Sequence, residues 1–290
     1  MNPVFLKIGS IEIRYYGMMY AISFLLGLFI AKKLCKEKNI DESLIENYAF
    51  VAIISGLIGG RLYYVLFNLD RYANNLLEIF AVWHGGIAIH GGIIGGFIGT
   101  YIYAKKNKVN VWDLTDIACI PLLLGQAIGR IGNFMNGEIH GVPTFTPFNV
   151  IFSLKPKFYE WYSYYQTLPL NDKLNFPQLV PWGIVFPKGS PAGNEFPNLL
   201  LHPAMIYELL LNLIGFLILL LFIRKIKGVK PGYVSFWYIV IYSINRIFVS
   251  FFRAEDLMFF GFRAPHVISL ILIIIGCFGI LITGRGKNEN

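Results

Sequence analysis

Long apolar runs, each close to the length of a membrane-spanning helix, limit the folds open to this chain. A helix needs about 20 predominantly apolar residues to cross the hydrocarbon core of a bilayer. Short lysine clusters separate the runs, which is typical of a polytopic membrane protein. The sequence therefore predicts an all-α polytopic membrane protein with seven transmembrane helices. The runs lie at about residues 15–34, 48–67, 90–104, 113–136, 203–223, 233–252 and 265–282.

The composition supports a membrane location. The chain has 290 residues, of which 56% are hydrophobic and 14% are charged, whereas a soluble domain carries about a quarter charged residues. The net charge is +8, but the charges form no continuous basic face, so we expect membrane lipids and no nucleic acid as partners. The cysteines Cys35, Cys119 and Cys277 are widely spaced and make no metal or disulfide framework.

The lysine and arginine clusters set the expected orientation, because cytoplasmic loops carry an excess of these residues. Clusters occupy 32–38, 105–108 and 224–230, and Arg285 and Lys287 follow the last apolar run. If the chain crosses the membrane seven times, all of these clusters fall on the same side of the membrane. The N-terminus is then expected outside and the C-terminus in the cytoplasm. The first residues lack the basic start and small-residue cleavage site of a removable signal peptide.

Residues 142–201 differ from the rest of the chain. They are rich in Pro, Tyr, Trp and Asn, and no run within them reaches the length of a membrane helix. We expect them to form an extracytoplasmic insertion between the fourth and fifth helices, made of short strands and loops with a helical piece around 157–166. The whole chain, 1–290, is then a single integral membrane domain that carries this insertion.

A polar stretch at residues 125–141 closes the fourth apolar run and is the strongest candidate for a functional site. Arg130 and Asn133 are three residues apart, so in a helix they share one face. Asn136-Gly137 is a helix stop signal, which places Glu138 in the turn beyond. An arginine this deep in a span costs roughly 2.5–3.5 kcal/mol on insertion scales. It is either a structural arginine paired to a neighbouring helix or part of a site, and the number of polar neighbours favours a site.

The predicted topology brings further polar residues toward the same half of the membrane. A cation-lined cavity there suits an anionic headgroup, because phosphate pairs bidentately with arginine. His90, at the start of the third run, could contact substrate or move a proton, whereas His84 fits an interfacial residue. The residues expected toward the outer half are Tyr16, His90, Arg130, Asn133, Asn136, Glu138, His202 and Glu208, with Arg246 nearer the middle.

At these residues the chain resembles the bacterial prolipoprotein diacylglyceryl transferases. The stretch Gly129–Glu138, followed by Gly141, is similar to the hallmark motif of that family, and it is long and specific. The resemblance extends through nearly the whole chain. Further similar segments are Tyr16–Tyr20, Gly59–Val65 with Arg61, His90–Gly92, His202-Pro203 with Tyr207-Glu208, and Arg246 with Phe251–Arg253.

The resemblance implies an enzyme of the bacterial inner membrane. Such an enzyme moves the diacylglyceryl group of phosphatidylglycerol to the sulfur of a lipobox cysteine in an exported prolipoprotein, and glycerol phosphate leaves. No metal or cofactor is implied. The implied catalytic residues are His90, Arg130, Arg246 and Tyr16. The implied substrate-binding residues are Arg130, Asn133, Asn136, Glu138, Gly141, Arg61, Tyr207 and Glu208. The identity of the base that takes the thiol proton is left open: it is His90, Arg246 or a phosphate oxygen.

Two positions depart from the family pattern. Ser250 stands where members usually carry a glutamate four residues after the arginine of the sixth helix, and Pro265-His266 replaces a Gly-Gln pair. With serine at 250, we expect lipid phosphate to neutralise Arg246. Two alternatives remain: a divergent paralogue that uses phosphatidylglycerol with another acceptor, and a lipid or anion transporter. The absence of an evident internal repeat argues against the transporter.

Overall fold

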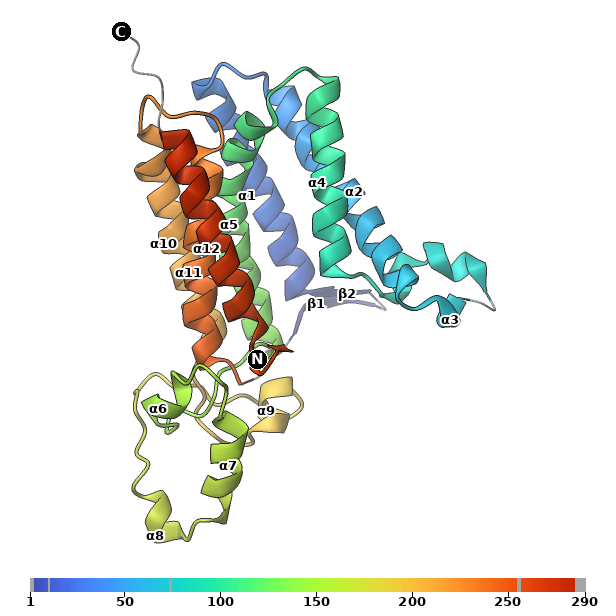
Figure 1. Ribbon diagram of the computed structural model, residues 1–290. Coiled ribbons are helices and arrows are strands. Elements are labelled where there is room, and N and C mark those ends of the chain that lie inside the picture. Colours follow the sequence, from blue (N-terminus) through green and yellow to red (C-terminus); the bar gives the residue numbers. More distant parts are fainter. Residues whose placement is uncertain (1–2, 10, 73–74, 255–256, 285–290) are drawn as a thin grey trace. The chain divides into compact units, whose positions relative to one another are not determined.

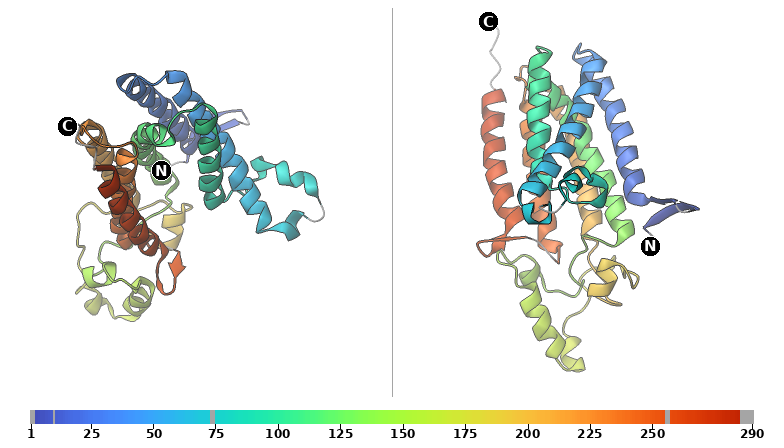
Figure 2. Two further views of the ribbon diagram at one scale, coloured as in Figure 1. Left: turned by 45° about the horizontal axis from the view of Figure 1, so that its top comes forward. Right: turned by 90° about the vertical axis from the view of Figure 1, so that its right-hand side faces the viewer.

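A computed structural model describes residues 3–9, 11–72, 75–254 and 257–284, and Figures 1 and 2 show its helices. The chain divides into two compact units. The first comprises residues 1–27 and 120–290, and the second comprises residues 28–119. Helices α1 (Tyr15–Glu37) and α5 (Val111–Asn136) each contribute to both units. The units are described separately below.

Among the residues that the structure describes, six helices are long and apolar enough to cross a membrane, by length and composition. This confirms a mainly helical, multi-pass membrane protein. The helix α4 (Ile89–Lys106), at the predicted third span, is not among the six, because its 18 residues include five glycines and end in two lysines. The six are α1 (Tyr15–Glu37), α2 (Glu42–Leu66), α5 (Val111–Asn136), α10 (Ala204–Leu221, extended by the 3-10 turn η3, Ile223–Lys225), α11 (Tyr233–Phe252) and α12 (Ala264–Gly284).

In the second unit, α2 and α4 pack through glycines. A side chain at Gly59 would collide with the backbone of Gly91 and Gly95, and one at Gly99 would collide with Ser55. Glycine thus lets the two backbones approach closely, as small residues do between membrane helices. Between α2 and α4 the chain forms a short helix and two 3-10 turns. These are α3 (Leu69–Tyr72), η1 (Leu76–Phe80) and η2 (Val82–His84).

In the first unit, α10, α11 and α12 lie side by side (Figure 1). Glycines of α12 make this close packing possible: a side chain at Gly279 would collide with the Phe236 ring, and one at Gly276 would lie 2.6 Å from a Val240 methyl. Between α10 and α11 the amide of Asn245 donates to the Asn212 side chain over 3.2 Å. Hydrogen bonds of this kind join helices inside a membrane.

The segment between α5 and α10 lies at one end of this bundle (Figure 1). The helical piece expected around 157–166 is present as α7, but the expected short strands are isolated bridges, such as Pro143 with Leu201. Stacked aromatic rings hold the segment together, with Phe158 buried against Tyr162 and Phe196. Its helices are α6 (Phe148–Ile151), α7 (Phe158–Thr167), α8 (Leu170–Lys173) and α9 (Pro191–Glu195).

Two small hairpins complete the described chain. The first pairs β1 (Val4–Ile8) with β2 (Ile11–Arg14) before α1. The second pairs β3 (Met258–Phe259) with β4 (Phe262–Arg263) between α11 and α12. Neither hairpin was expected from the sequence. The strands β3 and β4 have two residues each, too few for alternation of apolar and polar residues to be informative, whereas the alternation at Ile11–Arg14 is long enough and was missed.

Candidate functional site

The last two turns of α5 carry a connected group of polar side chains. Arg130 Nη1 donates to the side-chain oxygen Oδ1 of Asn133 over 3.1 Å, which confirms that these two residues share a face of the helix. The Asn133 amide donates to the Tyr16 hydroxyl of α1, and that hydroxyl donates to Glu138 Oε2 over 3.3 Å. Gly132 makes room for this contact, because a side chain there would lie 3.3 Å from the Tyr16 ring.

Glu208 of α10 is the counter-ion of both membrane arginines of this unit. Arg130 Nη2 lies 2.5 Å from Glu208 Oε1, and Arg246 Nη1 lies 4.0 Å from Glu208 Oε2. The Glu208 residue is 1% exposed, whereas the side chains of Arg130 and Arg246 are 20% and 18% exposed. The carboxylate is therefore buried behind two guanidinium groups that remain partly accessible. One carboxylate between two guanidinium groups leaves a net positive charge, so the expectation that lipid phosphate neutralises Arg246 stays a prediction.

The turn after α5 takes the form that the sequence predicts. The helix ends at Asn136, and Gly137 adopts a φ of +66°, in the left-handed region that favours glycine. The amide of Glu138 then donates to the Asn133 backbone carbonyl over 3.0 Å. The Asn136 side chain donates to Glu138 Oε1 over 3.3 Å. The turn therefore fixes the Glu138 carboxylate beside Tyr16.

Gly141 has a packing role in this structure. Its amide donates to the His202 carbonyl over 2.9 Å, and its backbone bridges to Arg253. A side chain at Gly141 would collide with the backbone of His202 and would lie 2.8 Å from the Phe252 carbonyl oxygen. Only glycine lets the chain pass between the start of α10 and the end of α11.

Tyr207 of α10 is held by two neighbours. Trp182 Nε1 donates to the Tyr207 hydroxyl over 2.7 Å, and His202 Nδ1 lies 3.0 Å from the same oxygen. Because an indole can only donate, the Tyr207 hydroxyl accepts the hydrogen bond from Trp182. Burial lowers the pKa of His202 to about 4, so the ring is neutral at physiological pH. Tyr207 and His202 are thus fixed as a neutral pair.

A further side-chain contact, which sequence reasoning missed, ties the α5 turn to the following segment. His140 Nε2 lies 3.0 Å from Glu195 Oε2, and the Tyr159 hydroxyl donates to Glu195 Oε1 over 2.7 Å. Burial raises the pKa of Glu195, but the hydrogen bonds from His140 and Tyr159 outweigh it and lower the pKa overall. The partners are far apart in the sequence, and no spacing pattern marks them.

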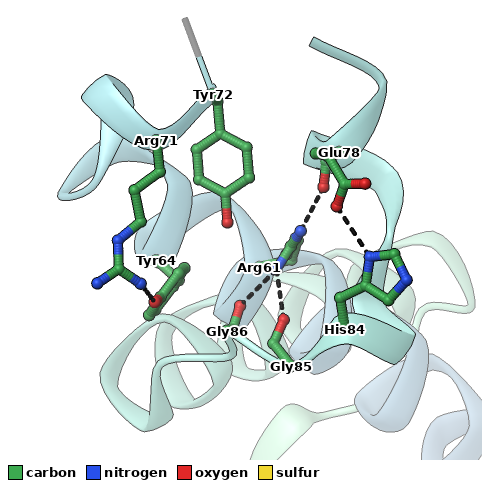
Figure 3. A pocket seen from close by; sticks show the side chains of 8 residues that line it. All are labelled: Arg61, Tyr64, Arg71, Tyr72, Glu78, His84, Gly85 and Gly86. Carbon is green, nitrogen blue, oxygen red and sulfur yellow. Dashed lines mark hydrogen bonds and ion pairs between the residues drawn. The ribbon is translucent and has the colours of Figure 1, made fainter. Parts of the chain in front are cut away.

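In the second unit, Arg61 holds the chain that follows α3. Arg61 is 6% exposed, and its guanidinium donates to the carbonyl oxygens of Gly85 over 2.6 Å and Gly86 over 3.0 Å. It also donates to the backbone carbonyls of Glu78 and, over 2.8 Å, Ile79. Figure 3 shows the contacts to Glu78, Gly85 and Gly86, which line a cavity of about 220 Å³ together with Arg61. The geometry of Arg61 fits a clamp on this loop better than a contact to substrate.

The two histidines near Arg61 have different surroundings. His84 Nδ1 lies 2.9 Å from Glu78 Oε2 and lines the same cavity (Figure 3). His90, the second residue of α4, is exposed, with its ring centre 6.2 Å from that of Tyr63. His90 and Arg61 belong to the second unit, and the other predicted site residues belong to the first. Within the first unit the structure brings together Tyr16, Arg130, Asn133, Asn136, Glu138, Glu208 and Arg246.

Comparison with known proteins gives one consistent result. The sequence model described as "Prolipoprotein diacylglyceryl transferase" matches residues 3–282. Proteins named phosphatidylglycerol–prolipoprotein diacylglyceryl transferase are 69% identical in Fusobacterium nucleatum (96% of each chain covered), 34% in Listeria monocytogenes (99% of this chain, 91% of the relative) and 31% in Streptococcus pneumoniae (99% and 96%). The chain therefore belongs to the prolipoprotein diacylglyceryl transferase family, as its central motif predicts.

Proposed function

We propose that this protein transfers the diacylglyceryl group of phosphatidylglycerol to the lipobox cysteine thiol of exported prolipoproteins. The relatives carry this activity in their names, and the match covers nearly the whole chain. One observation supports the proposal for the site: two partly exposed arginines, Arg130 and Arg246, form ion pairs with the same buried carboxylate, that of Glu208. Two guanidinium groups held side by side suit a phosphodiester.

The reaction needs a nucleophile and a stabilised leaving group. The cysteine sulfur attacks the glyceryl carbon that is esterified to phosphate, a carbon–sulfur bond forms and the carbon–oxygen bond breaks. The phosphate keeps the bonding electrons and leaves as glycerol phosphate, and the developing charge is stabilised by Arg130 and Arg246. The thiol proton goes to a base near the sulfur, for which His90 is our first candidate, ahead of Arg246 and a phosphate oxygen.

The neighbouring polar residues would orient these groups. Tyr16 and Asn133 connect Arg130 to Glu138 through hydrogen bonds, so that a headgroup bound at Arg130 meets hydroxyl and amide groups of fixed direction. We assign substrate contacts to Tyr16, Arg130, Asn133 and Arg246. The remaining candidates would hold other residues or the backbone in place and would not contact substrate themselves. These are Asn136, Glu138, Gly141, Tyr207 and Glu208 in the first unit, and Arg61 in the second.

The direct test is a transfer assay with purified protein. The protein is incubated with phosphatidylglycerol and a synthetic lipobox peptide, and the mass of the peptide is measured. A mass gain of one diacylglyceryl group, with release of glycerol phosphate, supports the proposal. Consumption of phosphatidylglycerol without peptide modification would favour a paralogue with another acceptor. Lipid movement between vesicles without either product would favour a transporter.

The two histidines provide a test of the predicted base. His90→Ala should lower the transfer rate sharply, because it removes the imidazole, next to the Gly91-Gly92 pair, that we propose as the base. His84→Ala should stay within a few-fold of the wild type, because His84 pairs with Glu78 on an exposed loop. Equal losses in the two variants would mean that the role has been assigned to the wrong histidine.

We further propose that the chain lies in the bacterial inner membrane with its N-terminus outside, its C-terminus in the cytoplasm, residues 142–201 outside and α4 as a seventh span. In a variant that lacks the native cysteines, Lys106→Cys and Lys227→Cys should resist an impermeant thiol reagent in intact cells. Lys188→Cys should react. All three positions are exposed, so reactivity reports the side of the membrane. Labelling at position 106 from outside would contradict the seven-span arrangement.

A further inference from the structure

The hairpin between α11 and α12 carries an uninterrupted apolar surface. Residues 257–262 read Leu-Met-Phe-Phe-Gly-Phe, without a polar side chain. All five side chains are exposed, with Leu257 at 78% and Phe260 at 86%. An amphipathic hairpin would bury one face and show polar residues on the other, whereas here both faces are apolar. Contiguous exposed apolar patches mark sites of association with a membrane or another molecule.

The tip of this hairpin goes against the local preference of the backbone. Phe260 and Gly261 form the two-residue turn between β3 and β4, and both have positive φ, +49° and +77°. A turn with positive φ at both central residues favours Asn-Gly, because asparagine tolerates the left-handed region and phenylalanine does not. A large aromatic residue at the most exposed point of a turn that it fits poorly indicates a function for its ring.

The hairpin is held firmly at its base. The Arg263 side chain is buried, and its Nη1 donates to the Ser250 backbone carbonyl over 2.6 Å, in the last turn of α11. The amide of Ala264 donates to the Leu257 carbonyl over 2.7 Å and closes the loop. Lys155 Nζ lies 5.7 Å from the centre of the Phe262 ring. The apolar tip is thus a fixed projection, flanked by a cation that can meet lipid phosphate.

The position of the hairpin decides what it contacts. It joins the ends of α11 and α12 (Figure 2). Because both helices are candidate membrane spans, we infer that the base of the hairpin lies where they leave the hydrocarbon core. Three residues of extended chain reach only about 10 Å from the base, and the interfacial layer of a bilayer is roughly 5–8 Å thick on each side. Aromatic side chains concentrate in this layer. We propose that residues 257–262 insert into the membrane interface as an apolar wedge that contacts the lipid between headgroup and acyl chain.

The test measures the depth of the tip in a bilayer. Phe260→Cys, in a Cys277→Ser background, is spin-labelled in nanodiscs of phosphatidylglycerol and phosphatidylethanolamine, and collision with oxygen is compared with collision with a water-soluble nickel chelate. Lys188→Cys is the matched exposed control. We expect a ratio of oxygen to nickel collision several-fold higher at 260 than at 188. Equal ratios would place the tip in water and overturn the proposal. Exclusion of both reagents at 260 would mean that protein, such as a second copy, covers it, and would also overturn the proposal.

A second variant separates membrane insertion from a merely structural role. Phe260→Asn supplies the residue that the turn prefers, so its Tm in detergent should not fall. A label at the neighbouring Met258→Cys should become more accessible to the nickel chelate in Phe260→Asn than in the wild type, because the ring that holds the tip in the interface is gone. An unchanged label together with an unchanged Tm would overturn the proposal. Neither measurement depends on transfer activity, so the outcome is distinct from that of the proposed reaction.

Discussion

Replacing Arg130 by lysine should abolish most of the transfer activity although the positive charge remains. In the structure one edge of the guanidinium donates to Asn133 while the other pairs with Glu208. A lysine ammonium is a compact charge that cannot keep both contacts and also meet a phosphate bidentately. Removal of a preorganised donor of this kind costs about 10²–10³ in kcat. The measurement is the rate of peptide lipidation at saturating phosphatidylglycerol.

Arg71→Lys is the matched control for this substitution. Arg71 is an exposed arginine whose Nη1 donates to the Tyr64 hydroxyl over 2.9 Å, in the second unit. The same change of side chain there should leave the rate within a few-fold of the wild type. If Arg130→Lys retained wild-type activity, charge alone would suffice at that position. The proposed bidentate contact to the lipid phosphate would then be wrong.

The sequence predicts six of the seven expected membrane helices well, because each of the six is a long apolar segment with a clear end. The helix α4, at the third run, is not among the helices apolar enough to span a membrane. The range 233–252 is reproduced by α11, and the Asn136-Gly137 stop signal ends α5 where expected. Of the five glycines in the third run, Gly91, Gly95 and Gly99 make the close contacts with α2. In a run with five glycines, composition cannot decide which side faces the neighbouring helix.

The sequence predicts which residues belong to the candidate site but not which of them contact one another across helices. The motif identifies Arg130 and Asn133 as neighbours because they belong to one helix. The pairing of Arg246 with Glu208 depends on how α10 and α11 pack, which no local pattern specifies. The serine at position 250 leads to the prediction that lipid phosphate neutralises Arg246. What the sequence does not indicate is that the Glu208 carboxylate, which also pairs with Arg130, lies near Arg246 from another helix.

This pairing makes Glu208 the residue whose loss should cost the most stability. The carboxylate is almost completely buried and lies near two guanidinium groups. Glu208→Gln keeps the size of the side chain but removes the charge, so two cations remain close together without this carboxylate. Removing one partner of a buried ion pair costs about 3–5 kcal/mol. We therefore expect a clear fall in Tm in detergent, whereas Glu160→Gln, on the exposed side of α7, should leave the Tm unchanged.

Anionic lipid should compensate for part of this loss. A phosphate bound at Arg130 and Arg246 supplies negative charge and stabilises the folded state by mass action. Phosphatidylglycerol should therefore raise the Tm of Glu208→Gln more than that of the wild type, and zwitterionic lipid should not. Glu208→Asp, which keeps the charge, should recover part of both Tm and kcat. If the variant lost stability but gained no additional shift from phosphatidylglycerol, Glu208 would stabilise the helix packing without positioning the arginines for a lipid phosphate.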